Sequence, residues 1–126
     1  MVERVEAKEL MEQAVRSLDS HKAEDIRVIG VTELTSLADY FVIASGSSST
    51  QVKALSDYVE KELMEKGEAP KRTEGYAASN WILMDYGTVV VHIFQKETRT
   101  FYDLERLWKD GRQMDMVELL SGGGDN

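Results

Sequence analysis

The sequence predicts an α/β fold, a single domain built on one mixed sheet of about five strands with helices around it. Three observations lead to this prediction. Segments with helical spacing of apolar residues alternate with short β-rich runs, in the order α-β-β-α-β-β-β-α. One run, residues 40–44, is apolar without interruption, which is typical of a central strand covered on both faces. The length of 126 residues suits a single core.

The first half of the chain contains two helices and two strands. Apolar residues at helical spacing predict the first helix: Ala7, Leu10, Met11, Ala14 and Leu18. A polar connection leads to a strand over residues 26–31, and the central strand follows. The second helix begins after a Gly-Ser-Ser-Ser run, where Ser48 and Gln51 have the spacing of a capping box. Its predicted inner face consists of Val52, Leu55, Tyr58, Val59 and Leu63.

The second half begins where Lys66 and Gly67 end that helix, with Pro70 just beyond. We expect a short edge strand over residues 71–74, a hairpin, and a short helix around residues 101–108. Residues 112–126 show no packing pattern. We therefore divide the chain into a domain of residues 1–111 and a C-terminal tail of residues 112–126, whose end is expected to be mobile.

The hairpin is the most informative segment. Two β-rich runs, residues 81–85 and 88–94, flank Tyr86 and Gly87, a two-residue loop in which the glycine can take a positive φ. This loop would pair Trp81 with His92. Because side chains alternate along a strand, one face is wholly aliphatic and is predicted to be core: Ile82, Met84, Val89, Val91 and Ile93.

The opposite face of the hairpin, which we call the mixed face, combines large rings with polar groups: Trp81, Leu83, Asp85, Thr88, Val90, His92 and Phe94. Binding surfaces have this character. The alternative is that a second layer of helices covers the face, with Trp81 and His92 as a partly buried pair. The sequence leaves both alternatives open.

Composition excludes several classes of protein. The chain has no cysteine, so disulfides and redox thiols are excluded. The charged N-terminus lacks a signal core and no apolar run approaches the ~18 residues of a membrane span, so we expect a cytoplasmic protein without a membrane partner. The formal net charge of −8 opposes phosphate-driven binding, so we expect no direct contact with nucleic acid. A basic protein is the expected type of partner.

The sequence contains no recognisable catalytic constellation. His21 lies in a charged connection and His92 within a strand, and neither has a second histidine or a cysteine four residues on. The serines that follow the central strand have no nearby base. We expect no enzymatic activity, no metal site and no cofactor.

Four sequence blocks resemble those of a known family and occur in the same order as in that family. They are TSLADYFVIASGSSS (residues 35–49), EGYAASNWILMDYG (residues 74–87), VVVHIF (residues 89–94) and RTFYDLERLW (residues 99–108). Over roughly residues 5–110 the chain resembles the ribosomal silencing factor family, also called Iojap-like proteins. One departure is Thr88, where the family more often has an acidic residue.

The resemblance implies a nucleotidyltransferase-like fold and a translational repressor. It implies binding to the large ribosomal subunit through ribosomal protein number fourteen, which sterically blocks joining of the small subunit, mainly under nutrient limitation. A homodimer of the free protein is a further expectation. We expect the contacts on the mixed face and the last helix: Trp81, Leu83, Asp85, His92, Phe94, Tyr102, Asp103, Glu105 and Trp108. For Tyr102 and Trp108 the alternative is packing of the last helix onto the sheet.

The fold likeness raises a rival hypothesis, a degenerate or residual nucleotidyltransferase that acts off the ribosome. Gly46 and Ser47 follow a strand and open a helix, as the phosphate-holding pair of such enzymes does. Asp57 lies at a suitable distance for a metal-binding carboxylate. The second carboxylate should then stand at position 59, which is Val59. A single carboxylate on a helix does not supply the ligands that two metal ions need.

Overall fold

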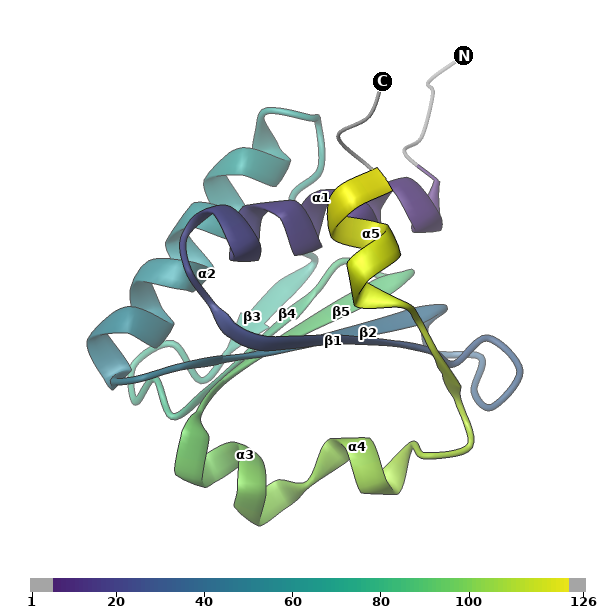
Figure 1. Ribbon diagram of the computed structural model, residues 1–126. Helices are drawn as coiled ribbons and strands as arrows, with labels where there is room; N and C mark the ends of the chain where they lie inside the picture. Colours follow the sequence, from purple (N-terminus) through teal and green to yellow (C-terminus); the bar gives the residue numbers. More distant parts are fainter. Residues whose placement is uncertain (1–5, 123–126) are drawn as a thin grey trace.

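The computed structural model describes residues 6–122, which form a six-stranded sheet between two layers of helices (Figure 1). Helices α1 (Ala7–Ser20), α2 (Ser49–Met64) and α5 (Met116–Gly122) cover one face of the sheet. Helices α3 (Lys96–Tyr102) and α4 (Leu104–Leu107) lie against the other face. The predicted α/β class is confirmed. No helix within residues 6–122 is long and apolar enough to cross a membrane.

The sheet is mixed. Its spatial order is β3-β4-β5-β2-β1-β6, in which β2 and β5 run parallel and the other neighbouring pairs are antiparallel. The strands are β1 (Glu24–Gly30), β2 (Tyr40–Gly46), β3 (Arg72–Glu74), β4 (Trp81–Asp85), β5 (Val89–Gln95) and β6 (Arg112–Gln113). β2 is central and buried from Phe41 to Gly46, as the uninterrupted apolar run predicted. β3 is the edge strand expected near residues 71–74.

The helices on the first face follow their sequence patterns closely. α1 buries its predicted apolar stripe from Leu10 to Leu18, while Ala7 is half-buried. Ser48 caps α2 by accepting a hydrogen bond from the Gln51 N–H at 3.1 Å. The inner face of α2 is buried except for Tyr58, whose ring is 43% exposed, so its predicted inward position is wrong. Tyr58 stacks on His21 at the end of α1, with 3.6 Å between ring centroids. The tyrosine therefore lies at the border between the two helices.

The hairpin is present, but its register differs by two residues from the prediction. The observed pairs are Trp81–Phe94, Leu83–His92 and Asp85–Val90. The turn consists of Gly87 and Thr88, closed by a 2.9 Å hydrogen bond from the Tyr86 N–H to the Val89 carbonyl, and Gly87 has a φ of +92°. A shift of two positions leaves every side chain on its predicted face, because the side-chain period is two.

Residues 112–122 belong to the fold, although the sequence analysis assigned them to a tail. β6 pairs with the end of β1, and α5 then packs against α1 (Figure 1). Residue 111 therefore does not mark the end of the folded domain, and the sheet has six strands instead of about five. The sequence did not reveal β6 because a strand of two residues is too short to show an alternating pattern. The mobility expected at the end of the chain concerns residues 123–126, which lie outside the described residues.

Candidate docking site

The two faces of the β4–β5 hairpin have different environments. The aliphatic face is fully buried between the sheet and α1 and α2, as predicted: Ile82, Met84, Val89, Val91 and Ile93. On the mixed face, α3 lies against β5 and β2 (Figure 1). Trp81, Leu83 and Asp85 on β4 remain half-buried. We call these three residues the β4 strip. Helices therefore cover one part of the mixed face, and the other part remains a surface.

Two of the predicted contact residues lie inside the protein. Phe94 is 0% exposed and His92 is 5% exposed. Neither offers surface to a partner, so their prediction as direct contacts is wrong. The cause is the layer above them, because the Trp81 ring stacks on Phe94 and Leu104 of α4 packs into the same cluster. Their role is to support the surface residues.

Trp81 is held from three sides. Its indole Nε1–H donates a hydrogen bond to Nδ1 of His92 at 3.1 Å. Its ring lies 4.8 Å from the ring of Phe94 and 4.8 Å from that of Tyr102, measured between centroids. These contacts fix the ring while part of it stays exposed. A ring that is already fixed loses little conformational freedom when a partner binds.

His92 acts as a buried neutral acceptor. Burial lowers its pKa to about 4, so the imidazole is uncharged at neutral pH. Because Nδ1 accepts the bond from Trp81, the ring proton is on Nε2, which has no hydrogen-bond partner in the structure. The one hydrogen bond of the His92 side chain therefore helps to hold the partly exposed Trp81 ring.

Asp85 lies within a small group of charged side chains at the edge of the sheet. It accepts a hydrogen bond from the Gly87 N–H at 2.8 Å, and its other oxygen lies 3.5 Å from Nε of Arg72. Arg72 also pairs with Glu74 at 3.2 Å. The β3–β4 register sets Arg72 opposite Asp85 and Glu74 opposite Leu83, so all of these residues share the mixed face. An acidic, partly paired border therefore lies beside an apolar strip.

The last predicted helix is divided in two. Asp103 has a φ of +51° and separates α3 from α4. Tyr102 is 51% exposed and leans on Trp81, so it joins the β4 strip at the surface. Trp108 is half-buried and packs edge-on against Phe41, with centroids 5.0 Å apart, as the packing alternative stated.

Glu105 was predicted to contact a partner, but it has an internal partner. Its Oε2 accepts hydrogen bonds from Arg99 at 2.6 Å and 3.0 Å. Arg99 is 7% exposed and also donates to the Asp25 carbonyl and to the Ser45 hydroxyl, each at 2.8 Å. A buried guanidinium is stable only with such a set of acceptors. Arg99 therefore fastens α3 and α4 to the ends of β1 and β2.

Sequence reasoning missed Arg99, Arg72 and Glu74. Arg99 stands in one of the sequence blocks, but its acceptors come from positions as far away as Asp25. The sequence predicted an edge strand that contains Arg72 and Glu74, but it did not indicate which strand pairs with it. The β3–β4 register that brings them beside Asp85 depends on pairing that local patterns do not specify.

The residues of the rival catalytic hypothesis have structural roles. Ser48 caps α2, and Ser47 donates its hydroxyl to the Gln51 side chain at 2.8 Å. Asp57 accepts a hydrogen bond from the Tyr76 hydroxyl at 2.8 Å, and Val59 is buried in the core. Within residues 6–122 no group of His, Asp or Glu side chains is arranged to hold a metal ion.

Fold and site together define a class: a small α/β domain that presents a half-buried aromatic and aliphatic strip with an acidic border. The sequence profile described as "Ribosomal silencing factor during starvation" matches residues 4–123. The chain belongs to this family. The match extends through β6 and α5, in agreement with the folded C-terminal segment.

Two curated bacterial relatives carry the same family name, and a mouse relative is named for assembly of the ribosomal large subunit. The chain is 38% identical over 113 residues to "Ribosomal silencing factor RsfS" of Halalkalibacterium halodurans, which covers 90% of this chain and 97% of that protein. It is 37% identical over 109 residues to the protein of that name from Bacillus subtilis, covering 86% of this chain and 92% of that one. It is 36% identical over 101 residues to "Mitochondrial assembly of ribosomal large subunit protein 1" of Mus musculus, covering 78% of this chain and 44% of that protein.

Solved structures of relatives have the same fold. Protein CV0518 from Chromobacterium violaceum superposes with a TM-score of 0.81 at 37% identity, over 83% of this chain and 88% of that one. A Bacillus halodurans protein superposes with a TM-score of 0.76 at 37% identity, over 86% of this chain and 98% of that one. The similarity therefore covers nearly the whole chain in sequence and in fold.

Proposed function

We propose that this protein represses translation by binding the large ribosomal subunit and preventing the small subunit from joining. The bound site is ribosomal protein number fourteen on the face where the subunits meet, and repression operates mainly under nutrient limitation. The mechanism is steric and involves no chemical step and no cofactor. This action takes place in the cytoplasm.

The observation that supports this proposal best is the β4 strip. Trp81, Leu83 and the adjoining Tyr102 form an apolar surface with a fixed aromatic anchor, and such anchors dominate interface energetics. Asp85 and Glu74 at its border suit a partner with basic side chains. The family membership and the printed names of the relatives, which refer to ribosomal silencing and to assembly of the large subunit, support the choice of partner.

The test is a subunit-joining assay with purified components. Large subunits are incubated with the protein before small subunits are added, and whole ribosomes are measured by light scattering. We expect fewer whole ribosomes, and we expect isolated ribosomal protein number fourteen to compete for the protein and restore joining. Normal joining at saturating protein would contradict the steric mechanism. Inhibition that the isolated ribosomal protein does not relieve would contradict the proposed partner.

We further propose that the free protein forms a homodimer through the same apolar surface. A hydrophobic strip that is left exposed favours self-association. Light scattering should give the mass of a dimer for the free protein and of a one-to-one complex after the ribosomal partner is added. A monomer at all concentrations would contradict this proposal.

A further inference from the structure

A groove runs between α3 and the β3–β4 connection, beside the β4 strip. It has a volume of about 520 Å³, and its lining includes Ala78, Trp81, Phe101 and Tyr102. Phe101 is 80% exposed and belongs to neither of the two core clusters. A projecting aromatic ring beside an apolar hollow is an arrangement that protein-binding sites use.

Both walls of the groove are built before any partner binds. In the connection, Ser79 is 1% exposed, and its N–H donates to the Gly75 carbonyl at 2.9 Å. The N–H of Gln95 donates to the Asn80 carbonyl at 2.9 Å and fastens the connection to β5. The opposite wall, α3, is fixed by Arg99. A preformed groove avoids the cost of ordering loops during association.

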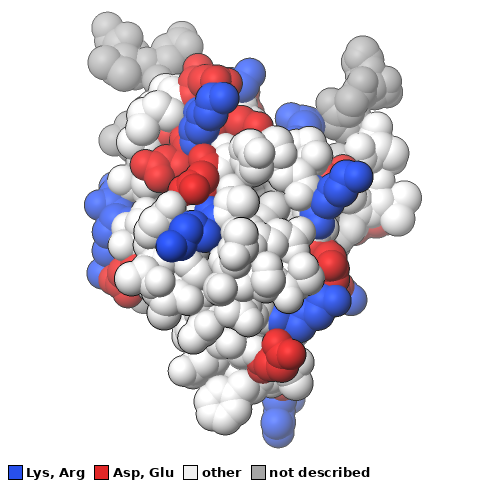
Figure 2. Space-filling view, turned by 90° about the vertical axis from the view of Figure 1, so that its left-hand side faces the viewer, with Lys and Arg blue, Asp and Glu red and all other residues white. Residues whose placement is uncertain are grey.

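The charges around the groove indicate what it accepts. Figure 2 shows the side of the molecule on which α3 and the edge of the sheet lie, and a broad uncharged area occupies its centre. Among the described residues that line the groove, Glu97 is the one acidic residue, and none is basic. Its neighbour Lys96 is paired with Glu24 at 2.6 Å. The groove therefore combines an apolar interior with one carboxylate at its rim.

We propose that this groove binds an apolar side chain of the ribosomal partner that is flanked by a lysine or arginine. The apolar side chain would lie between Phe101 and Trp81, and the neighbouring cation would meet Glu97. The net charge of −8 disfavours an RNA segment as the occupant, whereas it attracts a basic protein. This inference rests on the proposed function, because it specifies the partner segment beside the β4 strip.

Variants of the groove test the inference in co-sedimentation with purified large subunits. Phe101→Ala removes the projecting ring, and Ala78→Leu fills the groove from an exposed position. The matched control is Leu37→Ala, because Leu37 is 82% exposed and lies in the connection between β1 and β2, at the other end of the molecule from α3 (Figure 1). We expect the two groove variants to bind at least about 10-fold more weakly than the wild type, with unchanged melting temperatures, and the control to bind normally.

Two further measurements address the chemistry of the occupant. Glu97→Gln should weaken binding about 3- to 10-fold and reduce its dependence on salt, because one charge contact is lost. A photo-crosslinking amino acid at position 101 should form an adduct with a ribosomal protein. An adduct with rRNA alone would overturn the choice of a protein segment.

The outcomes separate the two proposals. If the wild type sediments with large subunits and both groove variants do so equally well, the groove inference is wrong and the proposed function stands. If the wild type does not bind large subunits at all, both are wrong.

Discussion

Trp81 has one side in the protein and one at the surface. Its indole N–H is satisfied by His92, and its ring packs on Phe94 and Tyr102, while the remainder is exposed. Two residues first expected to touch the partner, His92 and Phe94, therefore act one layer below it. At the scale of single residues, the candidate site is the partly exposed Trp81 ring, held in place by the buried residues His92 and Phe94.

Neighbouring positions on β4 provide a matched test of the two faces. Leu83 is half-buried on the β4 strip, whereas Met84 is fully buried in the main core. We predict that Leu83→Ala weakens binding to the large subunit about 5- to 30-fold and changes the melting temperature little. Met84→Ala should lower the free energy of unfolding by about 2–5 kcal/mol and leave the affinity of the folded protein unchanged. Co-sedimentation and urea unfolding measure the two effects, and the opposite pattern would show that the faces are assigned wrongly.

The buried imidazole of His92 makes stability depend on pH. Burial lowers its pKa to about 4, whereas an unfolded histidine has a pKa of about 6.5, so the unfolded chain takes up the proton first as the pH falls. The stability linked to neutral His92 is therefore complete above about pH 6.5 and is lost as the pH falls through about 4, by a total on the order of 3 kcal/mol.

The measurement is urea unfolding at several pH values between these limits. We predict that the free energy of unfolding falls more steeply for the wild type than for His92→Gln, since glutamine keeps a hydrogen-bond acceptor but does not titrate. Carboxylates titrate in the same range in both proteins, so the difference between the two curves isolates His92. Parallel curves would refute the prediction.

At the scale of elements, the break at Asp103 determines how the second layer lies. A continuous helix over residues 101–108 would not turn its residues toward both the β4 strip and the sheet. The left-handed conformation of Asp103 ends α3 with Tyr102 on Trp81 and starts α4 with Leu104 buried in the second cluster. Because α3 ends at Tyr102, this side chain borders both the groove and the β4 strip.

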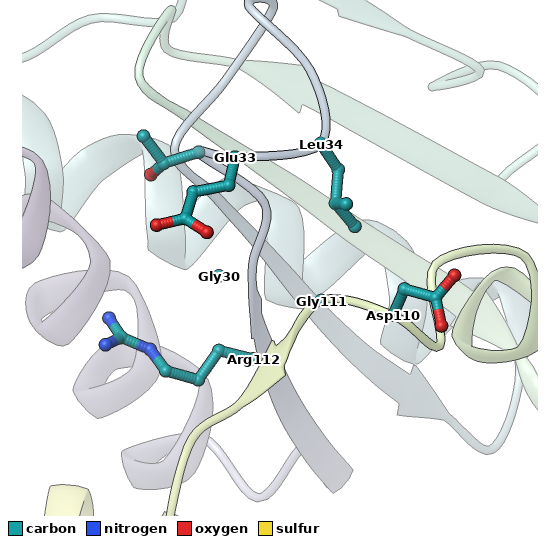
Figure 3. A pocket seen from close by; sticks show the side chains of 7 residues that line it. Gly30, Glu33, Leu34, Asp110, Gly111 and Arg112 are labelled. Carbon is teal, nitrogen blue, oxygen red and sulfur yellow. The ribbon is translucent and has the colours of Figure 1, made fainter.

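The docking of β6 depends on a close approach at Gly111. Figure 3 shows Gly111 close to Gly30, in a hollow bordered by Glu33, Leu34 and Arg112. A Cβ on Gly111 would lie 2.4 Å from Cγ2 of Ile29 and 2.8 Å from the Gly30 carbonyl oxygen, closer than atoms can pack.

We predict that Gly111→Ala lowers the free energy of unfolding by about 1–3 kcal/mol, the usual cost of overpacking. It should also speed hydrogen exchange at the Met114 amide, which bonds to the Val28 carbonyl at 3.0 Å. Gly30→Ala is the control, because its Cβ would meet Arg112 at an ordinary 3.6 Å. If both variants are equally stable, the close approach does not constrain β6.

At the scale of the whole molecule, the acidic charge selects among partners. The net charge of −8 is carried on a surface that also has a broad uncharged area, with charged side chains around it (Figure 2). We predict co-sedimentation with intact large subunits and no measurable binding to protein-free rRNA at ~150 mM salt, because RNA affinity comes mainly from phosphate contacts. Filter binding with labelled rRNA measures this. Tight binding to the bare RNA would require a basic surface and would refute the prediction.

Local patterns in the sequence determined much of the fold. The helical spacing of α1 and α2, the Ser48 cap and the apolar run of β2 each depend on residues a few positions apart, and each was predicted correctly except at Tyr58. The two faces of the hairpin were also predicted correctly, although its register was not. Alternation has a period of two, so a slip of two residues preserves the faces and cannot be detected from them.

The tertiary structure alone decided which parts of those faces remain accessible. Alternation assigned Trp81, His92 and Phe94 to one face, but only the placement of α3 and α4 buried two of them. Arg99 bonds to a residue 74 positions away, and the groove beside Phe101 is formed by segments that meet only after folding. The exposure of a side chain depends on these long-range contacts, whereas the periodicity of the sequence shows only which nearby residues lie on the same face of a helix or strand. The sequence by itself therefore determined the elements and their faces, and packing determined which residues form the surface that we propose binds the partner.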